Sequence, residues 1–201
     1  MNVTMDLVRN RRSIRAYSSR QIPGDIMRLL GDFLSETHTG PFGSEVRFVI
    51  AREDDPAWIR SLGTYGFIRG ASLFIVGSVR KSPDAFCDFG FCMEDAILYA
   101  TQLGLGTCWL GGTFQRARLT RALLLREDEI IPCITPVGLP AERPTLTSRA
   151  VRTLARSDRR KPWESLFFSG AAGAPLDPAG AGRWGDCFEA VRLAPSASNK
   201  Q

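Results

Sequence analysis

The sequence has 201 residues and a net charge of +5, with 44% hydrophobic and 23% charged residues, a composition typical of a folded domain and not of a disordered chain. Its one histidine, His38, excludes most zinc sites and most Ser-His-Asp or Cys-His machinery. No apolar run reaches the roughly 18 residues of a membrane span. The start has no signal-peptide pattern and the five cysteines are odd in number, so we expect a cytoplasmic protein with reduced thiols.

The first predicted element is a short helix over residues 4–10, capped by Thr4 or Asp6, that runs into a basic cluster. Three arginines and a serine form this cluster: Arg11, Arg12, Ser13 and Arg15. The planar donor fork of arginine matches phosphate oxygens, and a serine hydroxyl adds a short donor, so the cluster is a candidate anion site. The alternative is a solvated basic helix end, because charge runs usually mark exposed faces.

A helix, a loop and a strand are predicted after the cluster. Pro23 at a first helical position, followed by apolar residues at helical spacing, predicts a helix that continues to Glu36. Gly and Pro within 38–43 predict a loop, which leads into a strand over 46–51. Two aspartates before a proline then predict a short helix that ends near Leu62.

The most apolar part of the sequence predicts a buried strand over 71–79, followed by the longest helix, which begins near Pro83 and ends at Gly104. Seven residues form the apolar stripe of this helix: Phe86, Phe89, Met93, Ala96, Ile97, Ala100 and Leu103. Glu94 and Asp95 are adjacent, so on a helix they point about 100° apart and cannot face each other as a catalytic pair. We therefore expect a structural role for both carboxylates.

Glycines flank a short strand that is predicted within Gly104–Gly112. The segment is no dinucleotide fingerprint, because Trp109 occupies a required glycine position and the segment follows a helix where the fingerprint opens one. Glycines after a strand do let a ligand ring approach the backbone closely. A helix is predicted over 119–125 and a strand over 130–139, where two prolines indicate an edge strand or a bulge.

The last part of the chain is first basic and then rich in Gly, Ala and Pro. Arg149, Arg152 and Arg156 would share one face of a helix, which we expect to be solvated. A helical turn over 163–168 precedes residues 169–182, whose composition predicts a linker or a long surface loop. A final amphipathic helical segment follows.

Four segments together resemble the nitroreductase-like flavoproteins. Arg11–Tyr17 (RRSIRAY) is similar to the opening signature of that family, and Gly104–Gly112 after a long helix resembles its flavin-facing segment. Arg159–Glu164 (RRKPWE) resembles its closing basic motif, and Ala194–Gln201 (APSASNKQ) resembles its Ala-Pro-Ser-x-x-Asn-x-Gln signature. The four segments are spread over most of the chain.

The resemblance implies an α+β, nitroreductase-like fold, with a central, mostly antiparallel sheet flanked by helices around a long buried central helix. It implies FMN as the cofactor and NAD(P)H as the electron donor. Hydride would pass from NAD(P)H through flavin N5 to a nitroaromatic or quinone-like acceptor, with the cofactor supplying the chemistry.

Site roles follow from the resemblance only where residues match its motifs. The FMN phosphate and ribityl chain would be held by the basic cluster: Arg11, Arg12, Ser13 and Arg15. Arg159 or Arg160 would add to this phosphate clamp. The N5 and O4 edge of the flavin would face backbone amides around three residues: Leu110, Gly111 and Gly112. The isoalloxazine and ribityl chain would be contacted from the other side by three more: Pro195, Ser196 and Asn199. No catalytic side chain and no metal is implied.

The order of the motifs departs from the family, where Pro-Ser-x-x-Asn normally comes soon after the arginine cluster. Here residues 38–44 hold that place, and the signature appears only at the end of the sequence. We therefore expect one nitroreductase-like half over 1–168, a linker over 169–182 and the start of a second, apparently truncated half over 183–201. This resembles nitroreductases with two fused pseudo-dimeric halves, so the protein would be a monomeric pseudo-dimer or a homodimer.

Two other functions stay open from the sequence. The substituted loop at 40–42 and the fragmentary second half are compatible with a flavin-binding sensor or carrier of the same fold without reductase activity. A nucleic-acid-binding module built on the basic residues 143–161 is disfavoured, because they have no interleaved aromatic platform and match no recognised motif. We expect a small aromatic acceptor as the partner, and neither nucleic acid nor a membrane.

Overall fold

The structure is a computed structural model. It describes the following residues: 3–52, 68–112, 119, 125–142, 160–171 and 173–196. They belong to two compact units, Arg11–Pro144 and a second unit made of Asn2–Asn10 together with Thr145–Gln201. Each unit is described by itself.

Several sequence predictions lie outside the described residues. These are the short helix that ends near Leu62, most of the helix over 119–125, and the basic helix face at Arg149, Arg152 and Arg156.

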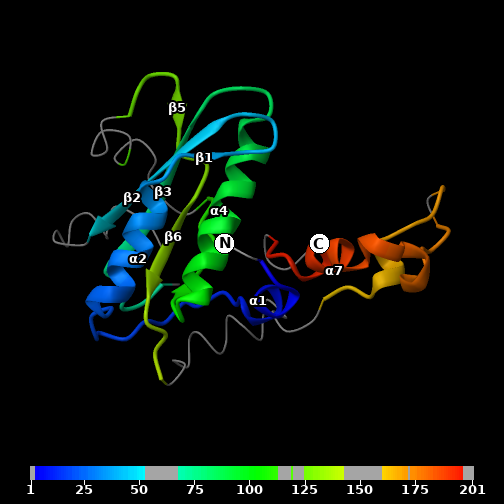
Figure 1. Cartoon of the computed structure of the whole chain (residues 1–201), viewed down its shortest axis with the longest axis horizontal. Coiled ribbons are helices and arrows are strands. Elements are labelled where there is room, and N and C mark those ends of the chain that lie inside the picture. Colours follow the sequence, from blue (N-terminus) through cyan, green and yellow to red (C-terminus); the bar gives the residue numbers. More distant parts are fainter. Residues whose placement is uncertain are drawn as a thin grey trace. The chain divides into compact units, whose positions relative to one another are not determined.

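The first unit is built on a six-stranded sheet (Figure 1). Its helices and strands are α2 (Gly24–Ser35), β1 (His38–Thr39), β2 (Glu45–Arg52), β3 (Leu73–Arg80), α4 (Ala85–Gln102), β4 (Gly106–Thr107), β5 (Glu129–Ile130) and β6 (Ile134–Gly138). The strand order is β1-β2-β3-β6-β4, and β5 pairs with β3. Every pairing between these described strands is antiparallel, which confirms the predicted α+β fold class.

Strand β3 is the centre of the sheet and is buried on both faces. Leu73 and Ile75 belong to one hydrophobic cluster, whereas Phe74 and Val76 belong to another. This alternation follows from the two-residue period of a strand. The near-continuous apolar run of β3 therefore predicts a strand with both faces covered, and the structure confirms it.

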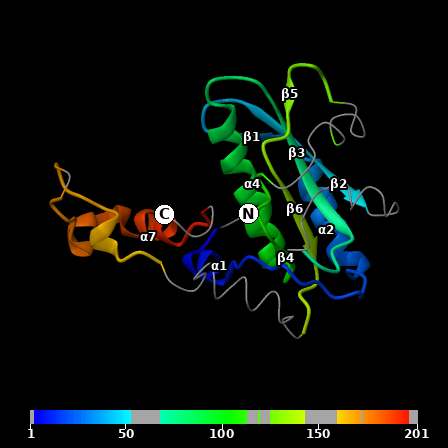
Figure 2. The same ribbon diagram turned by 180° about the vertical axis from the view of Figure 1, so that it is seen from behind.

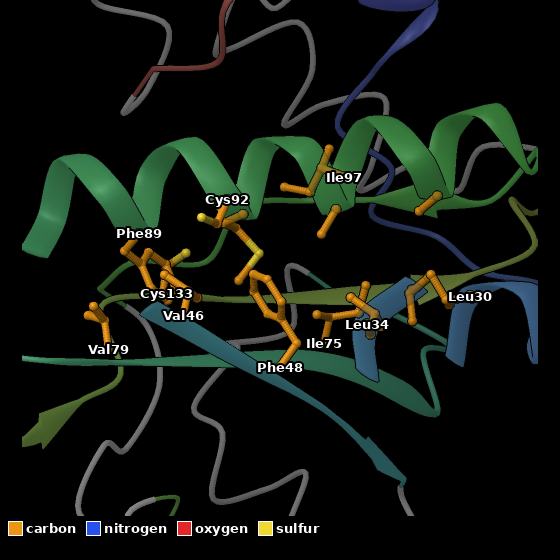
Figure 3. Packing of buried hydrophobic residues seen from close by; sticks show 14 of the residues in the cluster. Leu30, Leu34, Val46, Phe48, Ile75, Val79, Phe89, Cys92, Ile97 and Cys133 are labelled. Carbon is orange, nitrogen blue, oxygen red and sulfur yellow. The ribbon is translucent and has the colours of Figure 1, made fainter. Parts of the chain in front are cut away.

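Helices α2 and α4 cover the same face of the sheet, as the view from behind shows (Figure 2). Phe89, Cys92 and Ile97 of α4 point toward Phe48 and Ile75 of the strands (Figure 3). Most of the predicted apolar stripe of α4 is therefore buried. The helix ends at a glycine with positive φ, Gly104 at +76°, as its sequence predicts.

The first turn of α4 departs from the predicted stripe. Phe86 is 66% exposed, so its predicted burial is wrong. At this end the helix packs through Ala85 and Asp88, both fully buried, and Asp88 accepts hydrogen bonds from the backbone amides of Phe42 and Ser44 at 2.7 and 2.8 Å. The packed side of the helix is therefore turned toward the loop before β2, and Phe86 is turned away from it.

The strand predicted over 130–139 is broken in two. Both pieces, β5 and β6, pair with β3, and Pro132 lies in the break. The prediction of an edge strand is wrong for β6, which also pairs with β4 on its other side. Pro136 is tolerated there because β4 pairs only with Val137 and Gly138 and Leu110 pairs with Ile134, so no strand residue lies opposite the proline on that side.

In its described residues the second unit consists of helices and loops and forms no sheet. Its elements are α1 (Met5–Asn10), the 3₁₀ helices η1 (Trp163–Ser165) and η2 (Pro178–Trp184), and α7 (Gly185–Leu193). Thr4 caps α1 as predicted, because its Oγ1 accepts from Leu7 N at 3.3 Å. Helix α1 packs against α7, and the rings of Trp163 and Phe167 both contact that of Phe188.

The described residues of the Gly-, Ala- and Pro-rich stretch at 169–182 are held by hydrogen bonds. Ser169 N donates to Ala174 O, and the indole of Trp163 donates to Leu176 O at 2.7 Å. The boundary between the two units falls after Pro144, not in this stretch. The division into halves at 169–182 stays a prediction.

Candidate functional site

The backbone of the basic segment is tied into the sheet. Ser13 pairs with Thr107 of β4 as a parallel bridge, and Ile14 N donates to Thr107 O at 2.7 Å. Further along, Tyr17 N donates to Arg69 O at 2.9 Å and Ser18 N donates to Leu139 O at 2.9 Å. The cluster is therefore an extended segment held beside β4 and not a freely solvated helix end.

The structure brings three of the four predicted side chains together around one buried thiol. Ser13 hydrogen-bonds Cys108, and Arg15 and Arg11 lie near enough to stabilise a negative charge on that sulfur. Arg15 Nη1 also donates to Ser13 O at 3.4 Å. The fourth side chain, Arg12, is exposed. The cluster thus gathers positive charge beside β4.

Arg11 is the buried member of the cluster, with 7% of its surface exposed. Its Nε lies 3.6 Å from Oε1 of Glu94 on α4. Its Nη1 is buried and has no hydrogen-bond partner within the described part of the chain. An unsatisfied buried donor costs about 1–3 kcal/mol, and more when it is charged, so the geometry fits an acceptor supplied by a bound anion.

Glu94 also accepts a hydrogen bond from the indole Nε1 of Trp109 at 2.7 Å. Burial raises the pKa of Glu94 above its usual value, while Arg11 and the Trp109 indole act in the opposite direction. From the sequence we expect a structural role for Glu94, whereas in the structure it contacts both Arg11 and Trp109 and so joins two of the motifs. The available signal was its place next to the buried stripe, between Met93 and Ile97, where a carboxylate needs partners.

The Cys108 thiol and the Tyr17 phenol stay protonated near neutral pH. Burial raises the pKa of the Cys108 thiol, although Arg15 and the Ser13 hydroxyl act against this. Burial and the neighbouring Cys108 raise the pKa of the Tyr17 phenol well above its usual value, and that phenol donates to Ile14 O at 2.7 Å. A thiol held in this form is a poor nucleophile, so the cluster is suited to binding and not to covalent catalysis.

The glycine-rich segment begins at β4 and passes Trp109 before reaching Gly111 and Gly112. Both glycines are exposed, and among the described residues no atom is found within 4 Å of a Cβ built on either of them. A ligand can therefore approach this backbone closely. Leu110 differs, because its amide already donates to Ile134 O at 2.9 Å and its side chain is buried. The Leu110 amide is therefore not available to a cofactor.

The other predicted site residues belong to the second unit, and two of them, Arg159 and Asn199, lie outside the described residues. Arg160 donates from Nε and Nη2 to Leu193 O, at 3.3 and 3.2 Å. Pro195 is half-buried and Ser196 is exposed. Arg160 therefore lies at the end of α7, directly before the Pro-Ser signature, so two of the four motifs are neighbours within this unit.

A pocket of about 110 Å³ lies further along the basic segment, with Ser18, Arg20, Arg52 and Ser72 in its lining. Its lining includes none of Arg11, Gly111 and Gly112, so it is separate from the candidate site. Within the described ranges, no three His, Cys, Asp or Glu side chains gather as a metal site requires. No helix in the described part of the chain is long and apolar enough to cross a membrane.

The fold is shared with several flavoprotein structures. A crystal structure described as an oxidoreductase containing FMN superposes with a TM-score of 0.66 at 19% identity, over 87% of this chain and 94% of that one. A putative nitroreductase from Desulfovibrio desulfuricans in complex with FMN superposes with a TM-score of 0.55 at 25% identity, over 74% of this chain and 95% of that one.

Sequence comparisons agree with the fold. A putative NADH dehydrogenase/NAD(P)H nitroreductase of Methanothermobacter thermautotrophicus is 28% identical over 153 residues, which are 70% of this chain and 78% of that protein. The family model described as "Putative TM nitroreductase" matches residues 3–201. Because this match spans almost the whole sequence, the chain belongs to that nitroreductase family.

Proposed function

We propose that the protein is an FMN-dependent oxidoreductase that takes hydride from NAD(P)H and passes it to a nitroaromatic or quinone-like acceptor. The observation that carries the proposal is the buried Nη1 of Arg11, a charged donor without an acceptor in the described residues, within a cluster tied to β4. A phosphate group is an acceptor whose oxygens match the fork of an arginine. Membership of the nitroreductase family supports the identity of the cofactor.

In this proposal the chain binds the phosphate and ribityl chain through the basic cluster. Arg11 supplies a preorganised buried donor, Ser13 and Arg15 add to the same wall, and Arg12 contributes from the exposed side. Gly111 and Gly112 are exposed and carry no side chain, so the ring can lie against the backbone there. When bound, FMN supplies the hydride chemistry at N5, and no ionised side chain of the site is needed for it.

The residues of the second unit stay part of the proposal. Pro195, Ser196 and Asn199 would contact the isoalloxazine and ribityl chain, and Arg159 would join the phosphate clamp. The two hydrogen bonds from Arg160 to Leu193 O favour a role for Arg160 in holding the loop that carries Pro195 and Ser196. These residues would act in the same chain if the chain holds two fused halves, or between chains in a homodimer.

The test is the visible spectrum of the purified protein, followed by anaerobic titration with NADH and NADPH. We expect flavin absorbance that is retained on gel filtration, is bleached by one of the two donors, and returns when a nitroaromatic or a quinone is added. Colourless protein that takes up no FMN on reconstitution would contradict the proposal. Bound flavin that neither donor bleaches would instead support the sensor or carrier function.

A further inference from the structure

Glu94 connects the two motifs of the first unit through the two oxygens of one carboxylate. Oε1 lies 3.6 Å from Nε of Arg11, and Oε2 accepts from Nε1 of Trp109 at 2.7 Å. Trp109 directly precedes Leu110, Gly111 and Gly112 in the glycine-rich segment. A single side chain thus contacts the basic cluster on one side and the start of the proposed ring-facing segment on the other.

The support for Glu94 is rigid. Its neighbours on α4, Met93 and Ile97, are fully buried in the main hydrophobic cluster. Only 30% of the Glu94 side chain is exposed, and only 5% of the Arg11 side chain. A carboxylate on a packed helix can hold its partners in one geometry better than a carboxylate on a loop.

The contact with Arg11 is made at Nε, which leaves Nη1 unused. A guanidinium is planar, with its donors in a fixed fork, so an ion pair on the Nε side favours one direction for Nη1. The same Nη1 is the buried donor without a partner in the described residues. Glu94 therefore aims this donor without occupying it.

We propose that Glu94 is a positioning residue for the cofactor site: it holds Arg11 so that Nη1 points at the FMN phosphate, and through Trp109 it fixes the glycine segment relative to that donor. This rests on the proposed function. Glu94 touches no cofactor atom in this role and acts through its two partners.

The substitution Glu94→Gln separates positioning from simple electrostatics. The amide keeps the size of the side chain and an oxygen that can accept from Trp109, but it carries no charge to hold Arg11. If Glu94 were only a nearby negative charge, its neutralisation would strengthen the binding of a phosphate dianion. A positioning role predicts the opposite sign, because the Arg11 guanidinium is released from its orientation.

The measurement compares FMN with riboflavin, which lacks the phosphate, by quenching of flavin fluorescence on apoprotein. For Glu94→Gln we expect FMN affinity to fall about tenfold, the size of one charge-assisted hydrogen bond, while riboflavin affinity stays within about twofold. Asp95→Asn, the same charge change at the next position of α4, is the matched control and should leave both affinities unchanged. Unchanged or tighter FMN binding by Glu94→Gln, or an equal loss for both ligands, overturns the proposal.

A double substitution tests whether Glu94 acts through Arg11. In an Arg11→Gln background, Glu94→Gln should cause no further loss of FMN affinity, because coupled residues are not additive. A full additional tenfold loss would contradict the coupling. Failure of the proposed function gives a different result, since the unsubstituted protein would then bind neither FMN nor riboflavin.

Discussion

Ile14 lies directly against Gly106, at the point where the basic segment meets strand β4. A Cβ built on Gly106 would lie 2.8 Å from both Cβ and Cγ2 of Ile14. The backbone hydrogen bond from Ile14 N to Thr107 O, at 2.7 Å, holds the two segments at this distance. The glycine is therefore required for the close approach that places Arg11 and Ser13 beside the sheet.

Gly106→Ala should separate the basic segment from β4. The atoms that the new methyl group meets lie at the base of a β-branched side chain, which cannot swing away easily. We expect a loss of about 1–3 kcal/mol in the free energy of unfolding, typical of overpacking, and weaker FMN binding. Chemical denaturation and flavin titration measure the two effects.

The matched control for this change is Gly31→Ala in the middle of α2. No atom lies within 4 Å of a Cβ at Gly31, so the substitution should leave stability unchanged or raise it by about 0.5–1 kcal/mol, the helical advantage of alanine over glycine. Equal effects at Gly31 and Gly106 would mean that contact with Ile14 is unimportant.

Arg11→Gln should weaken FMN binding by about tenfold or more, because a charge-assisted hydrogen bond contributes about 1.5–3 kcal/mol. Riboflavin binding should change little, since the lost donor faces the phosphate in our proposal. The control is Arg28→Gln, which removes a mostly exposed arginine paired with Asp32 on α2. If Arg11→Gln binds FMN as tightly as the unsubstituted protein, the buried Nη1 serves another purpose.

Most of the fold follows from local patterns in the sequence. The apolar run of β3 and the helical spacing within α4 are long and strongly periodic, and such elements are predictable. The interior position of β6 cannot be predicted in this way. Its neighbour β4 consists only of Gly106 and Thr107, which is too short to show an alternation of apolar and polar residues. The exposure of Phe86 has a similar cause, since it depends on packing of the 40–44 loop against Asp88.

The candidate site likewise has residues that can be predicted from the sequence and residues that cannot. Residue types make Arg11 and Ser13 a candidate anion site, because arginine forks and short donors suit phosphate, and this assignment stays a prediction. The position of Glu94 beside the buried stripe indicates that it needs partners, but its sequence neighbours do not say which residues these are. Its partners Arg11 and Trp109 come from separate segments that the sheet brings together.

The five thiols should differ sharply in reactivity. Cys87 and Cys187 are exposed, whereas Cys92, Cys108 and Cys133 are buried. Burial, with Asp88 and Asp95 nearby, raises the pKa of Cys92 to about 11, and burial also raises the pKa of Cys108. Because the thiolate is the reactive form, both thiols are protected from reaction at neutral pH twice, by their burial and by their raised pKa.

Titration with Ellman's reagent should accordingly show fast reaction only at the two exposed thiols of the native protein, and at all five after denaturation. The variant with Cys87→Ser and Cys187→Ser together should show no fast phase. A fast thiol that persists in that variant would show that one of the buried cysteines is accessible in solution.

Asp88 makes the stability of the protein depend on pH in the acidic range. Burial by itself would raise the pKa of this carboxyl, but hydrogen bonds from the Ser44 hydroxyl and from the amides of Phe42 and Ser44 together lower it below its usual value. The folded state therefore binds the proton more weakly than the unfolded chain, whose aspartate pKa is about 3.9. The stabilisation is complete above that value and is lost as pH falls through the folded-state pKa.

We expect Asp88→Asn to lower the melting temperature by a few degrees at neutral pH, because an amide oxygen replaces a carboxylate that accepts from two backbone amides. The difference from the unsubstituted protein should begin to narrow below about pH 4, where the carboxylate of the unfolded chain takes up its proton. It should vanish once the pH has fallen through the lower pKa of the folded state. Glu45→Gln, an exposed carboxylate beside the same loop, is the control and should give parallel curves. A difference for Asp88→Asn that stays constant down to the lowest pH would show that the carboxylate charge has no part in holding the loop.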